Sequence, residues 1–99
     1  ILGAAANHAL TIIDGFNTTA SAFIAKALSP QVSDYLMASH LSLEQAHKKS
    51  LDALGLSEYI DLDFRLGESI GAGIQKKMLD MAISVYRECV TKEEAGVEA

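Results

Sequence analysis

The pattern of apolar and polar positions predicts short strands between helices. Residues 10–14 (LTIID) form a β-branched apolar run without alternation, which is typical of a strand buried on both faces of a parallel sheet. Residues 34–39 (DYLMAS) suit a second, weaker strand. Residues 59–64 (YIDLDF) alternate apolar and acidic side chains and suit a short strand or an extended segment. The spacing predicts helices over residues 2–8, 17–28, 42–54 and 70–90.

Residues at the ends of the predicted helices support these assignments. Asn17 or Thr18 can cap the second helix, and Ser29-Pro30 ends it. For the third helix, Ser42 and Gln45 have the spacing of a capping box, and a C′ glycine follows at position 55. The apolar stripes that we expect consist of Ala20, Phe23, Ile24, Ala27 and Leu28 in the second helix, of Leu43, Ala46, Ser50, Leu51 and Leu54 in the third, and of Ile70, Ile74, Met78, Met81 and Val85 in the fourth.

This order of elements predicts an α/β fold with a parallel sheet. Two strands cannot form a stable parallel sheet covered on both faces, so we expect further strands from an absent part of the chain or from a second copy. The chain opens at Ile1, within a predicted helix, and this also suggests a piece of a longer polypeptide.

The composition of the chain argues against several classes of function. The net charge of −5, with 8 Lys and Arg against 13 Asp and Glu, argues against nucleic acid as a partner. A single cysteine, Cys89, allows no internal disulfide and suggests a reduced, cytoplasmic setting. No apolar run approaches the length of a membrane span, about 18 residues. No histidine pair has metal-ligand spacing, so we expect no metal site.

The stretch RLGESIGAG (65–73) places Glu68 between an arginine and three glycines, just before a predicted helix. It lacks the GK[ST] ending of a P-loop. One interpretation is a solvated acidic residue that the helix dipole stabilises, at a helix entry where glycines allow close packing. The other is a general base beside a bound substrate.

Two further segments, DGFN (14–17) and SHLS (39–42), directly follow the predicted strands. The carboxyl ends of parallel strands meet at one edge, where α/β proteins bind ligands. We therefore expect these segments and RLGES to form a cleft. His40 is a candidate acid or base there or a structural residue, whereas His8 and His47 have the pattern of surface residues.

The motifs IIDGF, YLMASHLS-x-E-x-x-H and RLGES-x-GA, in this order, resemble the C-terminal part of the nicotinate-nucleotide–dimethylbenzimidazole phosphoribosyltransferase family. The resemblance extends from about residue 3 to residue 97. It implies homodimers with a Rossmann-like parallel-sheet domain and a small helical domain. Residues 1–64 would then be the last strands and helices of the sheet domain, residues 65–90 an active-site loop and a long helix of the small domain, and residues 91–99 an acidic tail.

The reaction that the resemblance implies belongs to cobalamin lower-ligand assembly. Dimethylbenzimidazole displaces nicotinate from nicotinate mononucleotide and gives α-ribazole 5′-phosphate, without a metal or cofactor. The glutamate of the family's LGE motif is the general base, and it matches Glu68. The implied substrate-binding residues are Leu66 and Gly67 for the benzimidazole, Gly15 and Ser42 for the nucleotide, Arg65 for its phosphate, and Asp14, Ser39 and His40 without an assigned moiety.

The sequence also departs from the family. Ser69 and Ile70 stand where the family has Gly followed by Ser or Thr. The larger Ile70 either changes the accepted base, to adenine or a phenol for example, or marks a paralogue without activity. The family's glycine-rich phosphate-binding segments are absent, so we expect this piece alone to be inactive. The alternatives are a non-catalytic α/β interaction module, such as a partner subunit, and a nucleotide-binding protein of another class that shares only the sheet edge.

Overall fold

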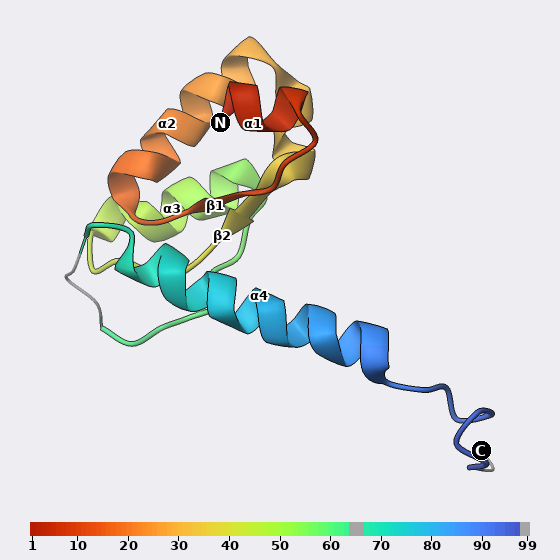
Figure 1. The fold of residues 1–99 in the computed structure, drawn as a ribbon. Coiled ribbons are helices and arrows are strands. Elements are labelled where there is room, and N and C mark those ends of the chain that lie inside the picture. The colour runs from red at the N-terminus through yellow and green to blue at the C-terminus, as the bar shows by residue number, and fades with distance from the viewer. Residues whose placement is uncertain (64–66, 98–99) are drawn as a thin grey trace.

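The computed structural model describes residues 1–63 and 67–97 (Figure 1). Helices and short parallel strands alternate along the chain, so the α/β prediction is confirmed. In chain order the elements are α1 (Leu2–Ala6), β1 (Thr11–Ile13), α2 (Phe16–Leu28), the 3₁₀ helix η1 (Pro30–Tyr35), β2 (Leu36–Ala38), α3 (Gln45–Leu54) and α4 (Ile70–Glu88).

Strands β1 and β2 pair in parallel and end at the same level. Their register aligns Thr11 with Leu36 and Ile13 with Ala38. The segments that follow, starting at Asp14 and Ser39, therefore leave the sheet side by side. Of residues 59–63, only Ile60 forms a bridge, a parallel one to His40, so this segment is extended rather than a regular strand.

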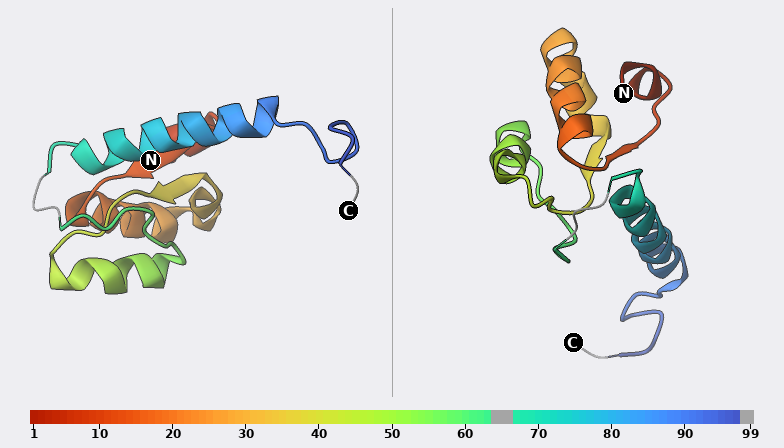
Figure 2. Two further views of the ribbon diagram at one scale, coloured as in Figure 1. Left: turned by 90° about the horizontal axis from the view of Figure 1, so that it is seen from below. Right: turned by 90° about the vertical axis from the view of Figure 1, so that its left-hand side faces the viewer.

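The strands lie between two helical layers. Helix α4 lies on one side, and α2 and α3 lie on the other (Figure 2). The core between the strands and α2, η1 and α3 consists of Ile13, Ala22, Ala25, Val32, Leu36, Ala38, Leu51 and Leu54. Among the described residues, no helix has both the length and the apolar character that a membrane span requires.

Helix α2 buries a different face from the one predicted. The buried residues are Thr19, Ala22 and Ala25, whereas the large apolar residues of the predicted stripe are exposed, Ile24 to 65% and Leu28 to 70%. Small side chains let the helix backbone approach the strands and α3 closely, and the larger ones face away. The predicted cap is also wrong, because the N-cap residue is Gly15.

Helix α3 starts two residues later than the capping box predicts. Its N-cap residue is Glu44, which makes no side-chain capping bond. The Ser42 hydroxyl instead accepts a hydrogen bond from the Glu44 N–H (3.2 Å) in the loop before the helix. The C-terminal prediction is confirmed, since Gly55 has a left-handed conformation with φ of 76°.

Helix α4 is anchored at one end only. Gly71 and Gln75 in its first turns are its buried residues. Beyond them the apolar stripe is exposed, with Met81 at 62% and Val85 at 60%. The helix continues away from the strands, and residues 89–97 follow beyond its far end (Figure 1).

Candidate active site

The strand ends and the start of α4 surround one cleft of about 850 Å³. This confirms that DGFN, SHLS and the glutamate loop lie together. Its described lining residues are Asp14, Gly15, Phe16, Asn17, Thr18, His40, Ser42, Leu43, Glu44, Gln45, Gly67, Glu68 and Ser69. Most predicted site residues are among them, whereas Arg65 and Leu66 lie outside the described residues.

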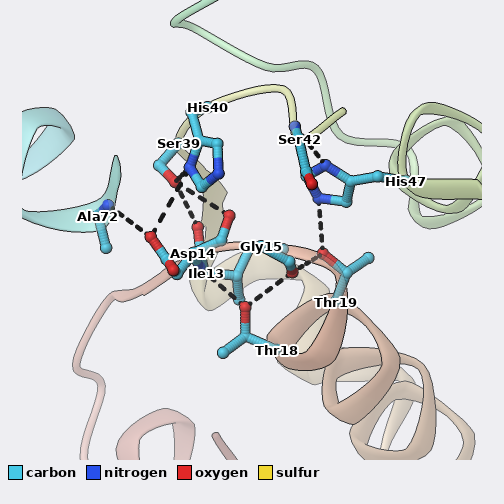
Figure 3. Close-up of polar contacts among 10 residues, drawn as sticks. All are labelled: Ile13, Asp14, Gly15, Thr18, Thr19, Ser39, His40, Ser42, His47 and Ala72. Atoms are coloured by element: carbon cyan, nitrogen blue, oxygen red, sulfur yellow. Dashed lines mark hydrogen bonds and ion pairs between the residues drawn. The ribbon is translucent and has the colours of Figure 1, made fainter. Parts of the chain in front are cut away.

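Asp14 links the end of β1 to the first turn of α4. Its carboxylate Oδ1 accepts a hydrogen bond from the Ala72 N–H at 3.1 Å (Figure 3). This amide is one of the N–H groups that a helix leaves without an internal partner. The N-cap residue Ser69 makes no side-chain capping bond, so Asp14 fulfils that role from another part of the chain.

His40 fills the space between Asp14 and α4. The His40 side chain is 1% exposed, and its Nδ1 lies 3.7 Å from Asp14 Oδ1 and 3.3 Å from Ser39 Oγ. The Ser39 hydroxyl donates its hydrogen to the Ile13 carbonyl (2.7 Å), so its oxygen is an acceptor for His40. Nδ1 therefore carries a proton that points toward the carboxylate of Asp14 and this oxygen. Ser39 itself is 1% exposed and does not line the cleft.

Gly71 permits this arrangement. A Cβ atom built on Gly71 would overlap the His40 imidazole ring, whereas one on Gly73 would meet nothing within 4 Å. His40 is buried and its Nδ1 lies close to Asp14 and Ser39, so a displaced ring would lose these contacts. Close approach of the α4 backbone to the sheet edge therefore requires glycine at position 71.

His47 was predicted to be a surface residue, and that prediction is wrong, because His47 is 0% exposed. Its Nδ1 accepts a hydrogen bond from the Ser42 N–H (2.9 Å), and its Nε2 lies 3.1 Å from Thr19 Oγ1 (Figure 3). The Thr19 hydroxyl donates to the Gly15 carbonyl at 2.8 Å. The histidine thus connects the two loops that follow β1 and β2.

Burial lowers the pKa of His47 below its usual value, because the charged imidazolium loses its hydration. The nearby His40 lowers this pKa further, whereas Glu58 and Asp14 oppose the change. The neutral form is favoured, in agreement with an Nδ1 atom that accepts a backbone hydrogen bond.

Glu68 lies on the rim of the cleft in an unusual backbone conformation. Glu68 and Ser69 both have left-handed φ values, 59° and 63°. Non-glycine residues pay a steric cost of about 1–2 kcal/mol each for this conformation, and such residues concentrate at functional sites. Both are exposed, and the Ile70 N–H closes the turn on the Gly67 carbonyl (3.3 Å).

The charge of the cleft limits its chemistry. Its described lining includes the carboxylates of Asp14, Glu44 and Glu68 and no lysine or arginine. Such a surface suits proton abstraction and contacts to hydroxyl groups, but it does not by itself neutralise a phosphate. Within the described residues, no group of three or more His, Cys, Asp or Glu side chains could hold a metal ion, and Cys89 is exposed.

Several lining residues were not predicted from the sequence. Leu43, Glu44 and Gln45 follow the segment SHLS, and their adjacency to Ser42 was the available signal. The role of His47, which does not line the cleft, was also missed, since it depends on pairing with Thr19, 28 residues earlier in the chain.

The cleft lies at the carboxyl ends of parallel strands, with an exposed carboxylate on its rim, and this is the place where α/β proteins commonly bind small molecules. The phosphoribosyltransferase family model DBI_PRT matches residues 1–97. The chain belongs to this family.

Curated relatives agree with this assignment. The chain is 43% identical over 97 residues to the nicotinate-nucleotide–dimethylbenzimidazole phosphoribosyltransferase of Geotalea uraniireducens and 45% identical to that of Syntrophobacter fumaroxidans. It covers 28% of each relative, so it spans little more than a quarter of their length.

Solved structures have the same fold. The crystal structure of the enzyme of this name from Thermus thermophilus matches with a TM-score of 0.93 and 38% identity. The match covers 99% of this chain and 29% of that chain. A second structure, described as CobT from the same organism, matches with a TM-score of 0.92. The similarity therefore includes nearly every described element.

Proposed function

We propose that this chain is part of a longer phosphoribosyltransferase of cobalamin lower-ligand assembly. The enzyme would transfer phosphoribose from nicotinate mononucleotide to dimethylbenzimidazole or a related aromatic base. The observation that carries the proposal is Glu68, which lies on the rim of the cleft formed by the strand ends. The names of the relatives supply the substrate class.

The chemistry requires one proton acceptor. A ring nitrogen of the benzimidazole attacks the anomeric carbon, and the bond from that carbon to the pyridinium nitrogen breaks with its electron pair going to nicotinate. Because the leaving ring becomes neutral as it departs, it requires no acid. The incoming ring must lose its N–H proton, which Glu68 would take as general base.

Structure around Glu68 supports this role. Asp14 holds the first turn of α4 through the Ala72 N–H, and Gly71 packs against His40. These contacts fix the start of α4 against the strand ends, and the turn with Glu68 directly precedes it. The exposed carboxylate is accessible to a base that enters the cleft. Left-handed φ values at Glu68 and Ser69 are the kind of strain that functional sites retain.

The substrate contacts belong to the same proposal. Gly15 and Ser42 would contact the nucleotide, Gly67 and Leu66 the aromatic base, and Arg65 the phosphate. A Cβ at Gly15 would meet the His40 ring at an ordinary 3.9 Å, so packing alone does not require glycine there. Close approach of a ligand to the backbone would explain this glycine.

The remainder of the enzyme would come from the longer chain. The described part of the cleft has no lysine or arginine for the phosphate, and large apolar residues of α2 and α4 are exposed. Apolar surface of this kind marks an interface. We propose that the 99-residue piece is inactive alone and that the whole protein is a cytoplasmic homodimer, as the family resemblance and the single cysteine suggest.

The test uses the full-length protein that carries this segment, unaltered and as Glu68→Gln. Each form is incubated with nicotinate mononucleotide and dimethylbenzimidazole, and α-ribazole phosphate is measured by mass spectrometry. We expect product from the unaltered protein and a loss of about 10²-fold or more in the variant, as for removal of a general base.

Two further variants sharpen this test. Glu88→Gln, at the end of α4, controls for the loss of a carboxylate far from the cleft and should leave the rate unchanged. Glu44→Gln removes another cleft carboxylate. A larger loss in Glu44→Gln than in Glu68→Gln would assign the base to Glu44. Absence of product with dimethylbenzimidazole, adenine and phenol would support the non-catalytic alternative.

A further inference from the structure

We propose that His47 is a positioning residue that sets the distance between the two nucleotide-contacting loops, those of Gly15 and Ser42. This inference rests on the proposed function, because these two residues are the proposed nucleotide contacts. His47 does not line the cleft, so it would act through Thr19 and the Ser42 backbone.

The hydrogen bonds determine the tautomer of His47. A backbone N–H can only donate, so Nδ1, which faces the Ser42 N–H at 2.9 Å, carries no proton. In the neutral ring the proton is then on Nε2, which donates to Thr19 Oγ1. Thr19 in turn donates to the Gly15 carbonyl, and the direction of every bond in the series is fixed.

This series joins groups from two segments that follow different strands. The Ser42 loop follows β2, and Gly15 follows β1 and is the N-cap of α2. A buried, fully satisfied hydrogen-bond network makes such a spacing rigid. A ligand that contacts both loops would then find them already arranged, which favours binding more than the chemical step.

Protonation would break the network. An imidazolium carries hydrogen on both nitrogens, so Nδ1 could no longer accept from Ser42. The titratable groups that face His47 are Asp14 at the end of β1, His40 at the end of β2 and Glu58 after α3. Burial keeps the folded pKa of His47 below its usual value, so the network persists through neutral pH and is lost at lower pH.

The stability of the folded protein changes with pH in the same direction as the network. As the pH falls below about 6.5, the unfolded chain binds a proton at this histidine before the folded chain does. The stability that neutral His47 supports is therefore present above this pH and decreases as the pH falls further.

The experiment measures steady-state kinetics of the full-length protein, unaltered and as Thr19→Val and His47→Asn. Thr19→Val removes the hydroxyl with little change of shape, and the shorter amide of Asn reaches only the position of Nδ1. We expect KM for nicotinate mononucleotide to rise about tenfold, which corresponds to about 1.4 kcal/mol, with kcat changed much less. We also expect KM of the unaltered protein to rise in mild acid and this rise to be absent in His47→Asn.

His8→Asn is the matched control. His8 is exposed and bonds Tyr35 (2.7 Å) away from the cleft, so its loss should not change KM. A fall in kcat with constant KM, or no kinetic change in folded variants, would overturn the inference while leaving the proposed function intact. No product from the unaltered protein would overturn both.

A spectroscopic measurement does not depend on the variants. In ¹⁵N NMR of the unaltered protein at neutral pH, Nε2 of His47 should have the shift of a protonated ring nitrogen and Nδ1 that of an unprotonated one. The opposite assignment would overturn the inference even if the variants failed to fold.

Discussion

The floor and the rim of the cleft differ in how their polar residues are held. Asp14 and His40 on the floor, and His47, which does not line the cleft, are at most 8% exposed, and short polar contacts tie each to another element. On the rim, Glu68 and Ser69 are exposed and have left-handed backbones.

The floor and the rim have different requirements. Buried polar groups must be paired, and a paired group is held in one place. A general base must instead keep its carboxylate accessible to the substrate. The contacts of the floor therefore position the rim, and in the proposed reaction the rim carries the general base. Substitutions on the floor should change stability first, whereas substitutions on the rim should change activity first.

Gly71→Ala tests the floor with the largest expected effect on stability. The added Cβ overlaps the buried His40 ring, and such overpacking costs about 1–3 kcal/mol. Thermal unfolding of the full-length protein should show a lower Tm. Gly73→Ala is the control, since a Cβ there meets nothing, and we expect it to stabilise the helix by about 0.5–1 kcal/mol. Equal Tm changes in both would contradict the close contact.

Asp14→Ala tests the link between β1 and α4. It leaves the Ala72 N–H without its acceptor, and loss of a helix cap costs about 1–2 kcal/mol. Asp14→Asn keeps an acceptor oxygen and should lose less than half as much. Chemical denaturation of the three forms gives the comparison. If Asn and Ala variants lost the same stability, the negative charge, rather than the hydrogen bond, would hold the helix.

Glu68→Gly tests the rim with the smallest expected change in stability. Glycine adopts a left-handed φ without the steric cost, so the variant should be more stable by about 1 kcal/mol and inactive. Asp63→Gly is the matched control, because Asp63 has a φ of 55° and does not line the cleft. It should gain similar stability and keep its activity. A destabilised Glu68→Gly protein would refute the proposed strain.

The sequence predicted the features that depend on neighbouring residues. The apolar run before Asp14 and the left-handed Gly55 were both recognised, because strand ends and helix ends have local signals. The meeting of the strand-end segments followed from one long-range assumption, that the strands are parallel.

The remaining features depend on contacts between distant parts of the chain. His47 has polar neighbours in sequence, and its burial follows from Thr19 and the Ser42 amide. Spacing favoured Ile24 and Leu28 as the packed face of α2, but the small Ala22 and Ala25 are buried. Pattern analysis weights large apolar side chains, whereas close helix packing selects small ones.

The contact between Gly71 and His40 also bears on how this protein can evolve. In the sequence the two glycines of GAG (71–73) look equivalent, yet the structure opposes every replacement at Gly71 and leaves open space at Gly73. Every other amino acid has a Cβ, so no mutational path leaves position 71 without disturbing His40. Among descendants of this sequence, neutral variation should accumulate at position 73 and not at position 71.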